Sequence, residues 1–222
     1  MKYFFVAFFI FVSLLMVNLT AVMGEEAKPV YQARDYSYLL GMPGFSNTIL
    51  QNHFKLYEGY AKNFDLIINR LETLLVEDKT GTPEYAEMER RLGWEFNGMR
   101  LHEYYFENLG GNGIIDEKSD LYKEICSEFG SFELWKKDFI SAGKMRGIGW
   151  VALYEDPRTG HLLNMWIDEH DTGHMAGGRL LLIMDVFEHA YMTDYQLDRA
   201  AYIDAFFKNI KWEEVSKRFE KK

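Results

Sequence analysis

The feature that most constrains this chain is a single change in the spacing of its apolar residues. Up to about residue 113 they recur at steps of three and four, and from Gly147 onward they form short runs separated by turn residues. Steps of three and four place side chains on one face of an α-helix, whereas short runs between turns are typical of β-strands. The sequence therefore predicts an α+β fold, in which a helical part precedes a part with a small sheet.

The helical part is predicted to be a long α-hairpin, which forms an N-terminal domain at residues 25–113. Ser46 or Asn47 is suited to cap the first helix, and Thr82-Pro83 supplies a cap and a first helical residue for the second. The glycine-rich segment 110–113 ends the second helix. The apolar stripe of the first helix consists of Ile49, Leu50, His53, Phe54, Tyr57, Phe64, Ile67, Ile68, Leu71, Leu74 and Leu75.

The second part is predicted to be a C-terminal α/β domain at residues 114–222. It should contain a small three-stranded antiparallel sheet with surrounding helices, because residues 156–160 have the composition of a hairpin turn between two apolar runs. The predicted strands are 147–154, 162–167 and 180–184. The predicted helices are 120–129, 132–145, 200–209 and 212–219.

The first residues, 1–24, have the layout of a secretory signal peptide. Lys2 precedes an apolar run at residues 3–17, and small residues follow before the charged part of the chain begins. The alternative is an uncleaved membrane anchor, but a spanning helix needs about 20 apolar residues, and Asn18 and Thr20 interrupt the run. We therefore expect an exported protein, periplasmic or secreted, with no stable membrane association after cleavage.

Charge and cysteine content exclude two classes of protein. The chain has 25 Lys and Arg against 34 Asp and Glu, a net charge of −9, which argues against a nucleic-acid partner. The single cysteine, Cys126, excludes an intrachain disulfide and a thiolate-rich metal site. The residues left for metal chemistry are the six histidines His53, His102, His161, His170, His174 and His189.

Asp185 and His189 make a metal site plausible on chemical grounds. Asp185 directly follows the apolar run 180–184, and a buried carboxylate is unfavourable unless it is paired or binds a cation. His53 and His102 each lie on one of the two predicted long helices. Three imidazoles and one carboxylate suit iron, manganese or zinc, so the spacing alone leaves redox chemistry and zinc hydrolysis both open.

Several ordered motifs show that the sequence resembles the iron/manganese superoxide dismutase family over nearly all of residues 40–219. Asp185-Val-Phe-Glu-His189-Ala-Tyr191 is similar to the family's D-x-[WF]-E-H-A-[YF] signature, and Asn97-Gly-Met-Arg-Leu-His102 is similar to its second ligand segment. Gly147-Ile-Gly-Trp150 and Asn209-Ile-Lys-Trp212 match two further segments.

The resemblance implies a ligand set and an activity. His53, His102, Asp185 and His189 would bind one iron or manganese ion per chain, with solvent as the fifth ligand. The reaction would convert two superoxide anions and two protons to O2 and H2O2. The resemblance slightly favours iron. Whether the protein uses iron, manganese or either metal stays open.

The resemblance also places a histidine beside the metal-bound solvent. The family supplies Gln or His there from one of two positions, and the helix position holds Gly98, which has no donor. His170, in the loop after the second strand, is therefore assigned to this role, with a solvated loop histidine as the alternative. His161 and His174 match no family role and are expected to be exposed loop residues. Trp150 is expected to wall the active site.

The chain departs from the family near its first ligand. The family usually has a second His four residues after that ligand and a gateway Tyr eight after it, but this chain has Tyr57 at the first position and Tyr60 one residue before the second. At about 100° per residue, seven residues return nearly to the face of His53, so Tyr60 is assigned as the gateway Tyr. The family's Tyr from a partner subunit, which pairs with the missing His, is Met192 here.

Two charged residues complete the predicted site. Glu188 would bridge to His189 of a second copy across a two-fold interface, which predicts a homodimer or homotetramer. Arg199 resembles the family's funnel arginine and would attract the anionic substrate locally, although it could equally be a helix salt-bridge partner. The functional alternatives are a non-enzymatic metal-binding family member and a zinc hydrolase with the same ligand set.

Overall fold

The protein is described by a computed structural model, and the residues that this structure describes are 31–220. From Tyr31 onward the chain forms one compact unit. The predicted signal peptide, residues 1–24, lies outside the described residues, so its assignment stays a prediction. Within the described range, every helix is too short or too polar to cross a bilayer.

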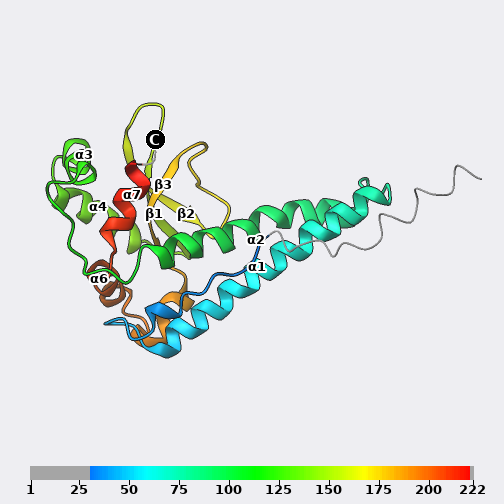
Figure 1. Cartoon of the computed structure of the whole chain (residues 1–222), viewed down its shortest axis with the longest axis horizontal. Helices are drawn as coiled ribbons and strands as arrows, with labels where there is room; N and C mark the ends of the chain where they lie inside the picture. Colours follow the sequence, from blue (N-terminus) through cyan, green and yellow to red (C-terminus); the bar gives the residue numbers. More distant parts are fainter. Residues whose placement is uncertain (1–30, 221–222) are drawn as a thin grey trace, which may run out of the picture. The chain divides into compact units, whose positions relative to one another are not determined.

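Two long antiparallel helices, α1 (Asn47–Val76) and α2 (Pro83–Glu107), form the predicted hairpin (Figure 1). The short helix η1 (Ser37–Leu39) precedes them. Ser46 Oγ accepts a hydrogen bond from the backbone N–H of Ile49, and Thr82 Oγ1 accepts one from that of Tyr85. Both predicted caps are thus confirmed, because each hydroxyl satisfies an N–H that lacks a partner within its helix.

A three-stranded antiparallel sheet follows, which confirms the predicted α+β fold class. Its strands are β1 (Gly149–Glu155), β2 (Leu162–Asp168) and β3 (Arg179–Asp185), in the order β2-β1-β3. Ala152 in the central strand pairs with Met165 on one side and Ile183 on the other. The first strand begins at Gly149 rather than 147. Gly149 has a φ of +144°, and a Cβ there would lie 2.0 Å from the carbonyl oxygen of Ile167, so only glycine fits at this position.

Helices surround the sheet. The described helices of this part are α3 (Asp120–Phe129), α4 (Phe132–Gly143), η2 (Glu188–Ala190), α5 (Met192–Tyr195), α6 (Arg199–Lys208) and α7 (Trp212–Glu220). The bounds predicted for α3 are confirmed, and α4 ends two residues earlier than predicted. The three- and four-residue helices η1, η2 and α5 were not predicted, because segments so short carry no hydrophobic period.

The packing of α2 against β3 brings the two parts of the chain together. Helices α2 and α7 lie against β3, while α4 lies against β1 and β2. The buried Asn108, which follows α2, accepts a hydrogen bond at Oδ1 from the backbone N–H of Ile183 in β3. This contact fixes the end of α2 beside the strand that ends in Asp185. A domain division at residue 113 stays a prediction.

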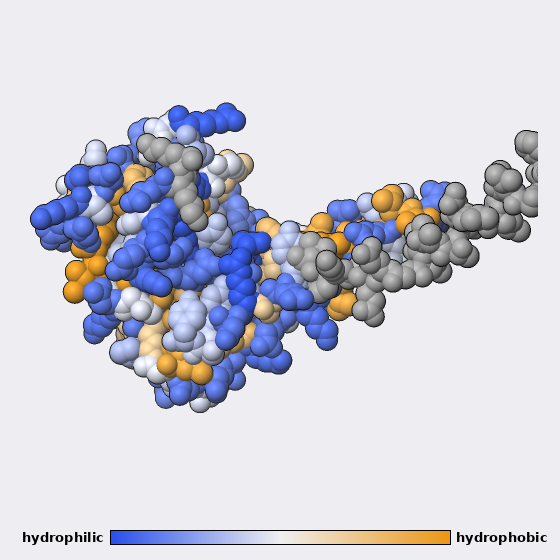
Figure 2. Space-filling model, in the orientation of Figure 1, coloured by the Kyte–Doolittle hydropathy of each residue, from blue (hydrophilic) through white to orange (hydrophobic). Residues whose placement is uncertain are grey.

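The surface is mainly hydrophilic on the face drawn in Figure 2, and hydrophobic residues appear there in small separate groups. On the hairpin, Leu66, Leu75 and Val76 of α1 are exposed. The fully buried side chains include Trp135 of α4, Trp150 of β1 and Tyr202 of α6. The core therefore runs from the sheet to the inner end of the hairpin.

Candidate metal centre

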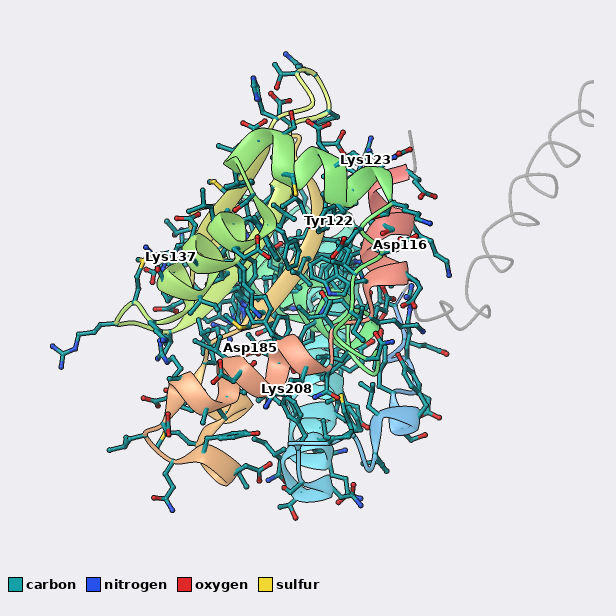
Figure 3. All side chains as sticks on the ribbon, turned by 90° about the vertical axis from the view of Figure 1, so that its left-hand side faces the viewer. Asp116, Tyr122, Lys123, Lys137, Asp185 and Lys208 are labelled. Atoms are coloured by element: carbon teal, nitrogen blue, oxygen red, sulfur yellow. The ribbon has the colours of Figure 1, made fainter. Side chains whose placement is uncertain are left out.

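Four potential metal ligands meet where the hairpin contacts the sheet. His53 comes from α1, His102 from α2, Asp185 from the last position of β3, and His189 from η2. Asp185 Oδ2 lies 3.1 Å from Nε2 of both His53 and His189, and 3.7 Å from Nε2 of His102. The four donor atoms all lie within 4.8 Å of one another. Figure 3 shows Asp185 inside the molecule, near α6.

Hydrogen bonds orient two of the four potential ligands, His102 and Asp185. The Nδ1–H of His102 donates to the carbonyl oxygen of Gly98, one turn earlier in α2, so Nε2 carries a lone pair. Asp185 Oδ1 accepts from the backbone N–H of Phe187 at 2.8 Å, and the Asp185 carbonyl accepts from Tyr202 Oη at 2.6 Å. These bonds fix Asp185 from both sides and leave Oδ2 to face the imidazoles.

The chemistry of this cluster fits a cation. Nε2 of His102 is fully buried and has no hydrogen-bond partner among the described residues, and an unpaired buried polar atom is unfavourable unless it binds something. Burial lowers the pKa values of His53 and His102. Burial acts to raise the pKa of Asp185, but His189 and His53 hold it well below its ordinary range. Neutral imidazoles and an ionised carboxylate are the protonation states that metal binding requires.

His170 lies beside the cluster and is completely buried, so the alternative of a solvated loop histidine is wrong. The indole Nε1–H of Trp150 donates to His170 Nδ1 at 3.1 Å. The hydrogen of the neutral ring therefore sits on Nε2, which lies 2.8 Å from Tyr60 Oη. Burial lowers the pKa of His170 to about 4, so the ring is neutral at pH 7. Its one N–H is thus donated to Tyr60, which leaves neither ring nitrogen to donate to a metal-bound solvent. The predicted role of His170 beside that solvent therefore stays a prediction.

Tyr60 reaches the cluster because α2 has no side chain at Gly98. The Tyr60 ring stacks on His102, with centroids 5.3 Å apart and an interplanar angle of 29°. A Cβ at Gly98 would lie only 2.5 Å from Tyr60 Cδ1. Gly98 therefore not only lacks a hydrogen-bond donor but also leaves room for the Tyr60 ring. Burial raises the pKa of Tyr60 to about 12, so the hydroxyl is protonated at neutral pH.

Aromatic rings enclose the remaining sides. Trp150 contacts His102 edge to face at 5.0 Å, in keeping with its predicted position as a wall of the site. Phe187 stacks on both His170 and His189, at 4.8 Å and 5.2 Å. Trp94 contacts His170 edge to face at 5.0 Å, and nothing in the spacing of Trp94 indicated this contact.

Two histidines were predicted to be exposed, and the prediction is right for His161 and wrong for His174. His161 is exposed and pairs with Glu128 at 2.9 Å. His174 is partly buried instead: its Nε2–H donates to the carbonyl oxygen of His170 at 2.9 Å, and its Nδ1 accepts from Tyr154 Oη at 3.2 Å. The sequence offered only the spacing of four residues between two loop histidines, which does not by itself predict a contact.

Arg199 is held by oxygen atoms that carry no full charge. Its guanidinium donates to the carbonyl oxygens of Met145 and Gly147, at 2.7 and 2.9 Å, and to Tyr191 Oη. Since its hydrogen-bond and ion-pair partners among residues 31–220 include no carboxylate, the alternative of a helix salt-bridge partner is not supported. The positive charge of Arg199 is therefore not cancelled by an ion pair there.

Tyr57, which stands where the family has a second His, is satisfied within the chain. Its hydroxyl donates to Glu103 Oε1 at 3.0 Å and accepts from the backbone N–H of Arg34 at 2.9 Å. Met192, the counterpart of the partner Tyr, is 40% exposed. Glu188 is exposed beside His189. Tyr57 thus makes both of these hydrogen bonds within one chain.

The fold and the cluster together define a class of protein. A helical hairpin supplies two imidazoles, and the end of a small antiparallel sheet supplies a carboxylate and a third imidazole. This arrangement is a candidate mononuclear metal centre with an N3O ligand set between two structural layers.

Comparison with known proteins identifies the family. Residues 117–218 match the family model for iron/manganese superoxide dismutases, C-terminal domain. The chain is 36% identical over 183 residues to a superoxide dismutase [Fe] of Cupriavidus metallidurans, a match that covers 80% of this chain and 90% of the relative. It is 31% identical to a superoxide dismutase [Mn] of Haloarcula marismortui, covering 90% and 97%. The chain belongs to the iron/manganese superoxide dismutase family.

Proposed function

We propose that this protein is a superoxide dismutase that uses one iron or manganese ion per chain. The observation that carries the proposal is the convergence of His53, His102, Asp185 and His189, with Nε2 of His102 buried and unpaired. Relatives named superoxide dismutase [Fe] and superoxide dismutase [Mn] support the activity and leave both metals open. The relatives from Cupriavidus metallidurans and Aquifex aeolicus are named for iron, and the one from Haloarcula marismortui is named for manganese. This favours iron slightly.

The reaction needs a site that exchanges single electrons and supplies protons. A bound iron or manganese ion provides the one-electron oxidation and reduction. One superoxide gives up an electron and leaves as O2, and a second superoxide accepts an electron and two protons and leaves as H2O2. Three imidazole ligands and one carboxylate would leave a bound ion with net positive charge, which would favour binding of an anion.

The surrounding residues orient hydrogen bonds and exclude water. Because Trp150 fixes the tautomer of His170, the hydroxyl oxygen of Tyr60 accepts the N–H of His170. The hydroxyl hydrogen of Tyr60 is then free to be donated towards the substrate. This geometry supports the assignment of Tyr60 as the gateway Tyr, with His170 as its partner. Phe187 stacks on the His170 ring, and Trp150 contacts the same ring at a tilted angle.

A zinc hydrolase is less well supported. Such an enzyme needs a general base beside the metal-bound water. Among the described residues at the cluster, Asp185 serves as a ligand, Nδ1 of His170 already accepts from Trp150, and the raised pKa keeps Tyr60 protonated. A non-enzymatic role is disfavoured because all four ligand positions are present.

The test combines metal analysis with a superoxide-consumption assay on purified protein. We expect iron or manganese near one ion per chain and rapid loss of superoxide. His102→Ala should remove both metal and activity, because it deletes the ligand atom of the cluster that is buried without a hydrogen-bond partner in the described structure. Stoichiometric zinc without dismutation would overturn the proposed function, and metal retained by His102→Ala would show that the ligand set is wrong.

Arg199 is proposed to attract superoxide to the site in a protein of net charge −9. Arg199→Ala should lower kcat/KM at low ionic strength, and the loss should shrink as salt screens charges over about 10 Å at 0.1 M. Lys123→Ala on α3 removes the same charge from a helix that supplies no part of the cluster. Equal kcat/KM for the two variants at low salt would contradict the attraction.

Assembly and location are proposed on narrower grounds. Exposure of Glu188 beside the partly exposed His189 supports a homodimer or homotetramer through these residues, and light scattering of wild type and Glu188→Ala tests it. The order of charged, apolar and small residues in 1–24 supports export. N-terminal sequencing of the protein from the periplasm or medium would show whether that segment has been removed.

A further inference from the structure

His174 contacts the backbone of His170, the histidine that lies beside the cluster. His174 Nε2 lies 2.9 Å from the carbonyl oxygen of His170. Tyr154 Oη lies 3.2 Å from the other ring nitrogen, Nδ1. A carbonyl can only accept, so Nε2 carries the hydrogen and Nδ1 accepts from Tyr154. The ring therefore joins the central strand β1 to the loop that carries His170.

This loop has an unusual backbone. Glu169, a residue with a side chain, has a φ of +49°, a conformation that persists only where surrounding contacts hold it. Gly173 has a φ of +101°, and a Cβ there would lie 2.4 Å from the carbonyl oxygen of Trp166. Asp168 and Thr172 exchange two backbone hydrogen bonds. The loop thus folds back on β2 and places His174 next to the carbonyl of His170.

The orientation of His170 matters because both of its ring nitrogens are used. Nδ1 accepts from Trp150 at 3.1 Å and Nε2 donates to Tyr60 at 2.8 Å. Both partners stand on other elements, β1 and α1, so they limit the ring but do not hold the loop. In the described structure the Nε2–H of His174 is the side-chain donor that holds the His170 carbonyl.

We propose that His174 is a positioning residue for the dismutase site. By holding the His170 carbonyl, it keeps the His170 ring between Trp150 and Tyr60, and so keeps the hydrogen of the Tyr60 hydroxyl directed towards the substrate. The proposal rests on the proposed function for its effect on rate, but the geometry it predicts is independent of activity.

Two amide substitutions separate this role from general packing. In His174→Gln the side-chain N–H2 reaches the position of Nε2, so it can still donate to the His170 carbonyl. In His174→Asn the amide reaches only the position of Nδ1, so it keeps the contact with Tyr154 and loses the one with His170. Tyr154→Phe removes the hydroxyl that contacts His174 and leaves His174 in place. This variant replaces His174→Asn in the experiment if His174→Asn does not fold.

The measurements are crystal structures of the metal-loaded variants, their metal content and their kcat/KM for superoxide. We expect His174→Gln to keep both His170 hydrogen bonds and to stay within about twofold of wild type. His174→Asn should lengthen at least one bond and lower kcat/KM by about tenfold at equal metal content, at the lower end of the losses typical when a partner of a metal-site residue is removed. Tyr154→Phe should fall between the two.

Two outcomes would overturn the proposal: equal kcat/KM in the Gln and Asn variants, or unchanged His170 hydrogen bonds in His174→Asn. If the wild-type protein consumed no superoxide, the proposed function would fail instead. The crystal structures would then still decide whether His174 positions His170.

Discussion

Replacing Gly98 by Ala should reverse the usual effect of this substitution in a helix. Alanine is normally favoured over glycine in a helix interior by about 0.5–1 kcal/mol. At Gly98, however, the new methyl carbon would lie 2.5, 2.7 and 2.8 Å from three carbons of the Tyr60 ring. Forcing one extra carbon into a packed core costs about 1–3 kcal/mol. The free energy of unfolding should therefore fall by about 1 kcal/mol.

Gly93 is the matched control, because it lies in the same helix and a Cβ there would have no neighbour within 4 Å. Gly93→Ala should raise the free energy of unfolding by about 0.5–1 kcal/mol. In a Tyr60→Ala background the clash disappears, so Gly98→Ala should become stabilising by a similar amount. A double-mutant cycle between Gly98 and Tyr60 should then give a coupling of about 2 kcal/mol.

Urea unfolding at equal metal loading is the assay, since bound metal adds its own stabilisation. Dismutation measured on the same samples should drop in Gly98→Ala, because Tyr60 must move away from Nε2 of His170. If Gly98→Ala stabilised the protein as Gly93→Ala does, Tyr60 would not lie where the structure places it.

Two further predictions concern pH and a partly buried ion pair. His170 has a pKa of about 4 in the folded protein and about 6.5 when unfolded, so its contribution to stability is fully present above pH 6.5 and is lost as pH falls towards 4. The loss of stability is at most about 3 kcal/mol. In His170→Gln, the free energy of unfolding should not show this loss as the pH falls. Acid unfolding curves of His170→Gln that fall as steeply as those of wild type would contradict the prediction. The buried guanidinium of Arg218 donates to the carbonyl oxygen of Leu181 and to Glu107, so Arg218→Met should lower the free energy of unfolding by about 3 kcal/mol. Arg90 is exposed, so Arg90→Met should change the free energy of unfolding by less than about 0.5 kcal/mol when both variants are unfolded in urea. Similar losses in the two variants would show that the Arg218 contacts do not stabilise the fold.

Local chemistry accounts for most of the fold that could be predicted. The caps at Ser46 and Thr82, and the whole of α3, depend on residues within a few positions of each other. The change from helical to strand spacing gave the α+β class for the same reason. The short helix α5 (Met192–Tyr195) has no such local signal and was missed.

The candidate site was predictable only in part. The residues His53, His102, Asp185 and His189 carry motifs, and the structure brings them together as the resemblance implied. The contact between His174 and the His170 carbonyl depends on the backbone conformation of Glu169 and Gly173, which the identity of those residues does not determine. Contacts made through backbone carbonyls leave no pattern in the side chains.

The hydrogen bond between Tyr57 and Glu103 was also not predictable, because it joins residues that are far apart in the sequence. Glu103 lies on the other hairpin helix, 46 residues away from Tyr57. Sequence comparison with the family showed that a His was missing, but not that Tyr57 would find a carboxylate within its own chain.

The origin of the four ligands has a consequence for how the protein acquires its metal. His53 and Asp185 are 132 residues apart, and closing a loop of that length costs about 4 kcal/mol in chain entropy. Before folding, only Asp185 and His189 are near each other, so an arriving ion meets two ligands at most. Tight binding must wait until the hairpin meets the sheet. Since selection among divalent metals depends on availability as well as affinity, the ion captured reflects the ions present when the chain closes. We therefore expect the metal content of the purified protein to depend on which ions are present in the compartment where the chain folds.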